Sequence, residues 1–360
     1  MNDFEQLNDI TAPLLYWYQG AARDLPWRRD PTPYHVWISE IMLQQTRVEA
    51  VRGYYARFLA AFPTVAALSE ADDDQLNKVW QGLGYYSRAR NLKRAAVMLM
   101  RDFGGELPAD HAALLTLPGV GAYTAGAIGS IAFGLPTPAV DGNVLRVVTR
   151  LCANGMDITK QATKDRVTAA LAAMYPQTPD EAAMMTQALM ELGAVVCVPG
   201  GAPHCTECPL ASTCLAHAEG RETEFPKKPP RRARTVENRT IFMLRHEGRY
   251  AIRRRPEMGL LSGLWEFPGV DEEIGADGVS DILARWGITA LSVAPIAPAK
   301  HIFTHIEWHM TGYLCETQGT SDAFLWETPK EILERYSVPS AFRAYLRLLD
   351  ADTADGIASV

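Results

Sequence analysis

Four of the six cysteines lie in one short segment, and this clustering constrains the fold more than any other feature of the chain. The thiols follow the pattern Cys197-x7-Cys205-x2-Cys208-x5-Cys214. Thiolates at such a spacing can surround a zinc ion or an iron–sulfur cluster, whereas four unrelated buried thiols would rarely fall so close together. Zinc ribbons usually pair two Cys-x2-Cys knuckles and this segment has one, so the spacing favours an iron–sulfur cluster over zinc.

The remaining composition is that of an ordinary globular protein. The chain of 360 residues is too long for one typical core, which predicts two domains. The N-terminus, Met1–Glu5, lacks the basic and apolar stretches of a secretory signal. The uncharged run 122–140 contains prolines and glycines, so a buried helix followed by a loop is expected instead of a membrane span. We therefore expect a cytoplasmic protein without membrane contact, where clustered thiols favour a metal site over disulfides.

Charge is distributed unevenly along the chain. The formal net charge is −7, which at first argues against a nucleic-acid partner. However, the segment from Arg221 to Arg239 carries seven basic residues against three acidic ones, while Asp271–Asp281 is acidic. Because the local charge governs binding, the net charge does not exclude DNA.

The hydrophobic periodicity changes in the second half of the chain. Residues 1–222 predict a helical domain, in which apolar residues recur at helical spacing. The clearest such segments are Val36–Val48, Asp74–Trp80, Arg88–Met100 and Asp165–Met174. Prolines alternate with basic residues in 223–237, which predicts a linker. Residues 238–350 then predict a mixed α/β domain, followed by a flexible tail at 351–360. Its elements would be a hairpin at 240–254, a strand at 302–313, and helices at 278–286 and 339–349.

A glycine-rich turn precedes the uncharged helix. In Leu117-Pro118-Gly119-Val120-Gly121, two glycines allow a sharp turn and a close approach of the backbone to another molecule. The free N–H groups at the start of the next helix would suit a phosphate. The turn could equally be an ordinary connection between two core helices.

Two carboxylates are candidates for chemistry. Glu40 stands among apolar residues in Val36–Thr46, where burial would raise its pKa and let it hold a proton near neutral pH. The alternative is a glutamate on the wet face of an amphipathic helix. Asp141 precedes a helical run and is a good N-cap, which would also fix the position of its carboxylate. An acid that protonates a base and a carboxylate that stabilises a sugar cation are what cleavage of an N-glycosidic bond requires.

These motifs together resemble a known family. The cysteine spacing is similar to the cluster loop of the endonuclease III family of DNA glycosylases, with seven residues instead of six in the first gap. The glycine-rich turn resembles its helix-hairpin-helix. Four further segments resemble MutY-type adenine DNA glycosylases, namely Leu25–Arg28, Ser39–Thr46, Gly82–Arg88 and Val140–Val144. The resemblance implies an all-α helix-hairpin-helix glycosylase domain with a [4Fe–4S] loop at about 197–214, and a Nudix-like α/β domain of 238–350.

The resemblance also implies roles for single residues. Glu40 would protonate adenine, Asp141 would stabilise the oxocarbenium ion or bond to it, and Tyr123 and Asn143 would support them. The four clustered cysteines would ligate the [4Fe–4S] cluster. Gln45 and Tyr85 would wedge into the base stack, where planar groups offset part of the stacking lost on base flipping; taken alone, Tyr85 could be a core aromatic. The remaining expected contacts to the base or the DNA are Arg28, Gln187, Thr46, Arg88, Gly119 and Gly121.

Position 123 distinguishes two reaction types. Relatives that also cut the DNA backbone resemble this motif with a lysine there, which forms a Schiff base with the sugar. This chain has Tyr123, and no lysine lies between Arg101 and Arg150. We therefore predict a glycosylase without efficient strand cleavage.

The segment Gly263–Gly269 resembles the strand and turn of a Nudix fold. A Nudix hydrolase needs a glutamate-rich helix for Mg²⁺, but Ala284 and Arg285 stand where paired glutamates belong, so we expect no hydrolase chemistry. Phe303-Thr304-His305 resembles the Phe-Ser-His loop that reads 8-oxoguanine in this family, with threonine in place of serine. The alternative is a plain strand with His305 facing solvent.

The resemblance therefore implies an enzyme that removes adenine mispaired with 8-oxoguanine or guanine from double-stranded DNA. We expect this enzyme to be monomeric and bacterial and to act at the nucleoid. Three alternatives remain. An endonuclease III-like glycosylase/lyase is disfavoured by Tyr123, a non-catalytic lesion sensor by the pair Glu40 and Asp141, and a Nudix hydrolase by the missing glutamates.

Overall fold

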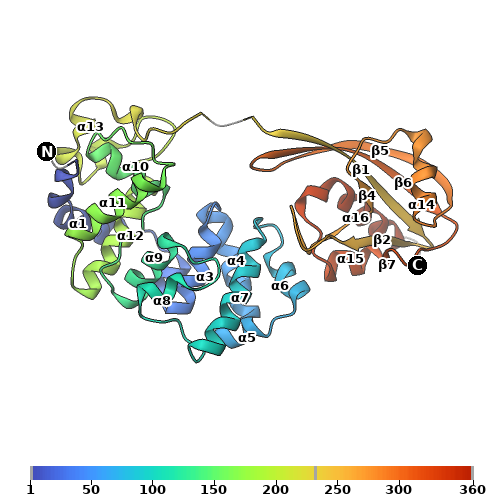
Figure 1. Ribbon diagram of the computed structural model, residues 1–360, viewed down its shortest axis with the longest axis horizontal. Helices are drawn as coiled ribbons and strands as arrows, with labels where there is room; N and C mark the ends of the chain where they lie inside the picture. Colours follow the sequence, from blue (N-terminus) through green and yellow to red (C-terminus); the bar gives the residue numbers. More distant parts are fainter. Residues whose placement is uncertain (1–2, 231–232, 358–360) are drawn as a thin grey trace. The chain divides into compact units, whose positions relative to one another are not determined.

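The chain folds into two compact units. The structure, a computed structural model, describes residues 3–230 and 233–357. We call the two units the helical unit (Met1–Glu70 with Arg90–Pro230) and the sheet unit (Ala71–Ala89 with Arg231–Val360). The sheet unit thus includes a short segment from the N-terminal half of the chain. Each unit is described separately below (Figure 1).

The helical unit has no strand among its described residues, as the periodicity predicts. Its α-helices are α1 (Thr11–Ala21), α2 (Pro26–Arg29), α3 (Pro33–Leu43), α4 (Val48–Ala61), α5 (Val65–Ser69), α7 (Ser87–Asp102), α8 (His111–Leu115), α9 (Ala122–Phe133), α10 (Gly142–Leu151), α11 (Gln161–Met174), α12 (Pro179–Val195) and α13 (Leu215–Ala218). Short 3-10 helices lie at Glu5–Asp9, Cys205–Glu207, Ala211–Thr213 and Glu222–Glu224. The start of α7 belongs to the sheet unit.

The core of the helical unit explains the uncharged run 122–140. That run forms α9 and a following loop, as predicted, and α9 contacts α3, α8 and α12. Gly126 allows the loop to cross close to the helix, because a Cβ atom there would lie 2.3 Å from the carbonyl oxygen of Pro138. A second cluster of buried side chains joins α1, α10, α11 and α12. These helices hold the residues of the candidate site in fixed positions.

Two boundaries differ from the expectations. The helix expected at Val36–Val48 ends at Leu43, because Gln45 adopts a left-handed φ of 57° and breaks the helical path before α4. The segment expected as a linker begins within the helical unit: Phe225 is buried, and the backbone N–H of Ile158 donates to the carbonyl oxygen of Lys227. The first strand then begins at Thr235.

The sheet unit contains one mixed sheet. Its helices are α6 (Asp73–Trp80), α14 (Val279–Arg285), α15 (Pro329–Arg335) and α16 (Arg343–Ile357), with 3-10 turns at Ala276–Gly278 and Ser340–Phe342. Its strands are β1 (Thr235–His246), β2 (Arg249–Arg254), β3 (Trp265–Glu266), β4 (Gly269–Val270), β5 (Ala290–Ile302), β6 (Ile306–Thr317) and β7 (Leu325–Glu327). The main order is β3-β2-β1-β6-β5, with β1 and β6 parallel and β1–β2 the expected hairpin. The helix α16 extends through Ile357 into the segment expected as a tail, and 358–360 lie outside the described residues.

Alternate residues of β1 pack on opposite faces of this sheet. Ile241 and Met243 contact the cluster that includes α15 and α16, whereas Phe242 and Leu244 contact the cluster that includes α14. A strand buried on both faces reads as a continuous apolar run, which is why Thr240–Leu244 was recognisable in the sequence. None of the described helices combines the length and the apolar character that a membrane crossing needs.

Candidate active site

One pocket of the helical unit collects most of the residues expected at the active site. It brings together Glu40, Tyr123, Asp141 and Asn143 with Arg28, Thr46 and Gln187. Its other lining residues are Arg23, Leu25, Trp27, Val36, Ser39, Leu43, Val48, Ile131, Met190, Glu191 and Ala194. The walls therefore combine apolar side chains with a few polar groups, which is the usual composition of a small-ligand site.

Glu40 lies on α3 and is buried, so the wet-face alternative for this residue is wrong. The hydroxyl group of Tyr123 donates a hydrogen bond of 2.6 Å to Glu40 Oε2. Burial raises the pKa of Glu40 to about 7, and the negative charge of Asp141 adds to this effect, while the Tyr123 hydrogen bond and the charge of Arg28 oppose it. A carboxyl group with such a pKa carries a proton part of the time at neutral pH, which suits a general acid.

Asp141 is the N-cap of α10, as the sequence predicts. Its Oδ1 atom accepts the backbone N–H of Val144 at 2.8 Å, and its Oδ2 atom accepts the side-chain amide of Asn143 at 2.9 Å. Burial raises the pKa of Asp141, whereas these hydrogen bonds oppose the rise. The cap therefore fixes a carboxylate beside the pocket, and donors hold both of its oxygen atoms.

Asn143 continues this hydrogen-bonded chain toward the cysteines. Arg146 Nη2 donates to Asn143 Oδ1 at 2.9 Å and to the carbonyl oxygen of Gly193 at 2.7 Å. Arg146 Nε donates to the carbonyl oxygen of Cys197 at 2.8 Å. A continuous set of hydrogen bonds thus joins the Asp141 carboxylate to the first cysteine of the cluster loop.

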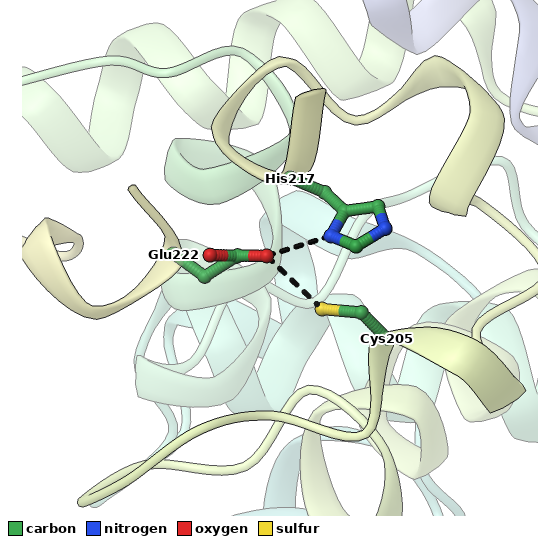
Figure 2. Close-up of side chains that lie close together, drawn as sticks. All are labelled: Cys205, His217 and Glu222. Atoms are coloured by element: carbon green, nitrogen blue, oxygen red, sulfur yellow. Dashed lines mark hydrogen bonds and ion pairs between the residues drawn. The ribbon is translucent and has the colours of Figure 1, made fainter. Parts of the chain in front are cut away.

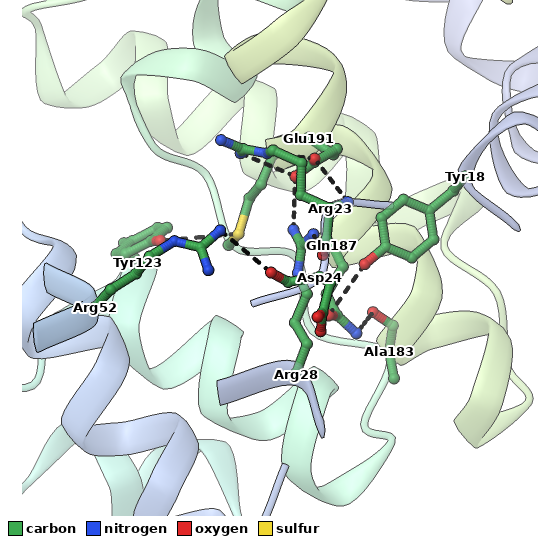
Figure 3. A network of polar contacts seen from close by, with 10 residues as sticks. Tyr18, Arg23, Asp24, Arg28, Arg52, Tyr123, Ala183, Gln187 and Glu191 are labelled. Carbon is green, nitrogen blue, oxygen red and sulfur yellow. Dashed lines mark hydrogen bonds and ion pairs between the residues drawn. The ribbon is translucent and has the colours of Figure 1, made fainter. Parts of the chain in front are cut away.

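One wall of the pocket is formed by a polar network that involves two arginines (Figure 3). Arg28 Nη2 donates to Glu191 Oε2 at 2.7 Å, and Arg23 Nε donates to Glu191 Oε1 at 2.6 Å. Tyr18 OH donates to Gln187 Oε1 at 3.2 Å. Sequence reasoning missed Arg23 and Glu191. Glu191 follows Gln187 by one helical turn on α12, and this spacing was the available signal, since residues four apart share a helix face.

The four clustered cysteines line a second pocket of the helical unit, together with Arg150, His217 and Glu222. Arg150 Nη1 donates to Cys197 Sγ at 3.3 Å, and Cys205 Sγ lies 3.6 Å from Glu222 Oε1, which in turn contacts His217 Nδ1 at 2.6 Å (Figure 2). A set of four thiols around one pocket, with an N–H group directed at a sulfur atom, fits a cysteine-ligated metal centre.

The extra residue in the first cysteine gap lies in an outward bulge. Gly200 and Gly201 are exposed, and a Cβ atom at either position would meet open space. The longer gap therefore has room at exposed glycines of the loop.

The glycine-rich turn connects α8 to α9. Gly119 has a φ of 80°, and a Cβ atom there would lie 2.7 Å from Asn91 Cβ, so this position requires glycine. Gly121 is the N-cap of α9, where a Cβ atom would meet nothing within 4 Å. The open space at Gly121 leaves the N-terminus of α9 approachable, while Tyr123, the second residue of the helix, reaches Glu40.

The two expected wedge residues share an unusual backbone conformation. Gln45 and Tyr85 have left-handed φ values of 57° and 48°, and both side chains are exposed. Tyr85 is therefore not a core aromatic. Arg88, expected to contact DNA, is buried, and its Nη2 atom donates to the carbonyl oxygens of Leu83 and Gly84 at 3.3 and 3.1 Å. These hydrogen bonds hold the backbone of the loop that carries Tyr85.

The Phe303-Thr304-His305 segment forms the turn between β5 and β6, so it is not part of a strand. Thr304 and His305 are exposed, whereas the ring of Phe303 packs edge-on against Trp308 with centroids 4.8 Å apart. Within the sheet unit, the Tyr85 hydroxyl group lies 2.8 Å from Thr304 Oγ1. An expected wedge residue and an expected lesion-reading residue are therefore neighbours.

Comparisons with known proteins show the family to which the chain belongs. Residues 38–176 match the model of the HhH-GPD superfamily base excision DNA repair proteins, and residues 240–348 match a NUDIX domain. An adenine DNA glycosylase of Rattus norvegicus is 33% identical over an alignment that covers 95% of this chain and 79% of the relative. The chain belongs to the adenine DNA glycosylase family. A bacterial member of the family, from Buchnera aphidicola subsp. Schizaphis graminum, is 30% identical over 72% of this chain and 75% of its own length.

Solved structures add the fold of the helical unit. A thermostable thymine-DNA glycosylase superposes with a TM-score of 0.53 at 26% identity, covering 59% of this chain and 97% of that one. Membership of the adenine DNA glycosylase family identifies the chain as a DNA glycosylase, an enzyme that hydrolyses N-glycosidic bonds, with a helix-hairpin-helix unit and a Nudix-like unit.

Proposed function

We propose that this enzyme removes adenine mispaired with 8-oxoguanine or guanine from double-stranded DNA. The observation that carries the proposal is the pocket in which a buried Glu40, bonded to Tyr123, faces the fixed carboxylate Asp141. A base inside a duplex cannot reach such a pocket, so the adenine would first be flipped out of the stack. Gln45 and Tyr85, both exposed, would occupy the space it leaves.

The chemistry follows from the two carboxyl groups. Glu40 donates its proton to the adenine ring, the bond between the base and the sugar carbon breaks, and the electron pair leaves with the base. Asp141 stabilises the resulting oxocarbenium ion or bonds to it. Water then adds to the sugar carbon and loses a proton, which restores the acid; where Asp141 has bonded to that carbon, this bond breaks as water adds and its electron pair returns to the carboxylate. Tyr123 orients Glu40 through its 2.6 Å hydrogen bond, and Asn143 holds Asp141.

Recognition would involve both units. Arg28 and Gln187 line the pocket and would contact the adenine, with Thr46 beside them. The N-terminus of α9 at Gly119 and Gly121 would contact a phosphate. Thr304 and His305, at the exposed turn of the sheet unit, would read the opposite base, because a hydroxyl and an imidazole can meet the altered edge of 8-oxoguanine.

The cysteine pocket would hold a [4Fe–4S] cluster through the thiolates of Cys197, Cys205, Cys208 and Cys214. When bound, the cluster would cross-link the loop that carries these residues and supply a one-electron redox couple. Arg150 would donate a hydrogen bond to one cluster sulfur ligand. Iron content and visible absorption of the purified protein test this assignment, with Cys208→Ser expected to lose both signals.

The test of the whole proposal is single-turnover cleavage of duplexes that carry adenine opposite 8-oxoguanine, guanine, cytosine or thymine. We expect free adenine to be released fastest opposite 8-oxoguanine and guanine, by a monomeric enzyme of the bacterial cytoplasm. Release of uracil or thymine glycol in place of adenine would overturn the substrate. Trapping of a stoichiometric covalent DNA adduct by borohydride would overturn the monofunctional mechanism, because Tyr123 cannot form a Schiff base.

A further inference from the structure

Glu191 is a fully buried carboxylate that the proposed chemistry does not use. It accepts hydrogen bonds from the backbone N–H, Nε and Nη2 of Arg23, at 3.2, 2.6 and 3.0 Å, and from Nη2 of Arg28 at 2.7 Å. Figure 3 shows both arginine side chains converging on it. A charge is costly to bury unless partners surround it, so this carboxylate is held there by two guanidinium groups.

The arrangement fixes Arg28 in more than one direction. Its Nη1 atom donates to the carbonyl oxygen of Arg23 at 3.1 Å, and its guanidinium group lies over the ring of Tyr18 at 5.6 Å. Arg23 is in turn held by Glu191 through both its backbone and its side chain. Glu191 therefore connects α12 to the segment that carries both arginines and sets where they stand in the pocket wall.

The same network holds Arg28, one of the charged groups that act on Glu40. Seven titratable groups belong to the pocket and its network, namely Tyr18, Arg23, Arg28, Glu40, Tyr123, Asp141 and Glu191. Two further charges act on members of this set from outside it, Glu49 on Arg23 and Arg146 on Asp141. The positive charge of Arg28 lowers the pKa of Glu40, against the larger effect of burial. For Glu191 itself burial favours the neutral form, but the hydrogen bonds from Arg23 and Arg28 hold its pKa below the ordinary value. Glu191 therefore stays ionised and cancels one of the two guanidinium charges.

We infer that Glu191 is a positioning residue for base excision: it holds Arg23 and Arg28 in place and balances their charge, so that Glu40 keeps its proton. The inference rests on the proposed function, since it assigns Glu40 the role of acid. It goes beyond that function because Glu191 acts on the proton of Glu40 from a different helix, through the arginines, without bonding to Glu40.

Glu191→Gln is the decisive variant, because it removes the charge and nearly keeps the shape. Without the negative charge, the arginines favour ionised Glu40, so the proton is lost at a lower pH. A fall of one unit in the pKa of Glu40, from about 7, would reduce its protonated fraction about ninefold at pH 8 but less than about twofold at pH 6. Single-turnover excision of adenine opposite 8-oxoguanine across this pH range should show that ratio.

Glu266→Gln is the matched control. Glu266 is also buried and also forms ion pairs with two arginines, Arg253 and Arg255, but it lies in the sheet unit, outside the catalytic pocket. Its loss removes a comparable ion-pair set, so it should leave the shape of the pH profile unchanged. Circular dichroism and thermal melting of both variants establish that they fold.

Arg23→Gln separates charge from geometry. It removes a positive charge, so it should move the basic limb of the profile to higher pH, opposite to Glu191→Gln. The double variant Arg23→Gln/Glu191→Gln restores the original net charge of the pocket wall. Its basic limb should therefore return to the original pH, although its excision rate is lower at every pH. If Glu191→Gln does not fold, Arg23→Gln still tests whether the charge of this wall sets the protonation of Glu40, and an unshifted basic limb would overturn the inference.

A titration that needs no activity completes the design. The Glu40 carboxyl signal of ¹³C-labelled protein, assigned by its absence in Glu40→Gln, should titrate at lower pH in Glu191→Gln than in the unmodified enzyme. An equal loss of rate at all pH values, together with an unchanged Glu40 titration, would overturn the inference and leave Glu191 a structural residue. If the unmodified enzyme releases no adenine, the proposed function fails, and the titration alone then decides about Glu191.

Discussion

The candidate active-site pocket of the helical unit and the β5–β6 turn of the sheet unit differ in how far their functional groups are exposed to water. The pocket collects side chains from α2, α3, α9, α10 and α12 around a buried carboxyl group. The turn comes from one hairpin and exposes Thr304 and His305 to solvent. An acid that is active near neutral pH needs a carboxyl group whose pKa is raised by burial, whereas hydrogen bonding to a base edge needs side chains that are exposed to the DNA. Chemistry and recognition are therefore expected to respond separately to mutation.

The largest expected effect is that of Glu40→Gln. The variant keeps the size of the side chain but cannot transfer a proton, so we expect excision to slow by about 10²- to 10⁴-fold. The measurement is the single-turnover rate opposite 8-oxoguanine and opposite guanine. The loss should be the same for both partners, because the turn is untouched. A loss confined to one partner would break the separation between the two regions.

The next prediction concerns the pH dependence of excision by the unmodified enzyme, where the expected change in rate is smaller than that of Glu40→Gln. Glu40 must be protonated to act, and burial raises its pKa to about 7. Excision should therefore fall about tenfold per pH unit well above that pH, and it should also fall at low pH where Asp141 takes up a proton, since burial raises the pKa of that carboxyl group. A profile that rises through pH 7 would mean that the ionised form of Glu40 is the active one.

Thr304→Val addresses the other region. It removes the hydroxyl group at nearly constant volume, and a hydrogen bond of about 0.5–1.5 kcal/mol corresponds to about two- to twelvefold. We expect the preference for 8-oxoguanine over guanine to fall by this factor, while the position of the pH profile stays fixed. Thr304→Ser is the control, since it keeps the hydroxyl and should keep the preference.

The smallest effect concerns the contact between Tyr85 and Thr304. Both side chains are exposed, so water competes for their hydrogen bond. A double-mutant cycle of Tyr85→Phe and Thr304→Val should give a coupling of about 0.5 kcal/mol, or roughly twofold, in the preference for 8-oxoguanine. Strict additivity of the two variants would show that the wedge and the turn act independently.

Motifs with short-range causes were predictable from the sequence. The cysteine spacing, the N-cap at Asp141 and the turn at Gly119 each depend on a few consecutive residues, and the structure shows all three. The switch from helical to alternating periodicity likewise predicted a helical unit followed by a sheet unit. The end of α3 was misplaced because a single left-handed residue, Gln45, overrides the apolar pattern.

Burial and long-range pairing were decided only by the tertiary structure. The sequence left Glu40 open between burial among apolar residues and a wet helix face, and it gave no sign that Arg88 is covered; both are buried, because neighbouring elements cover them. Glu191 and Arg23 are far apart in sequence, so no local pattern connects them, yet they form one charged wall. The sequence by itself determined which chemical groups this glycosylase carries and which short motifs present them. The tertiary structure decided which of these groups are buried and which charged groups pair, since both depend on contacts between distant segments.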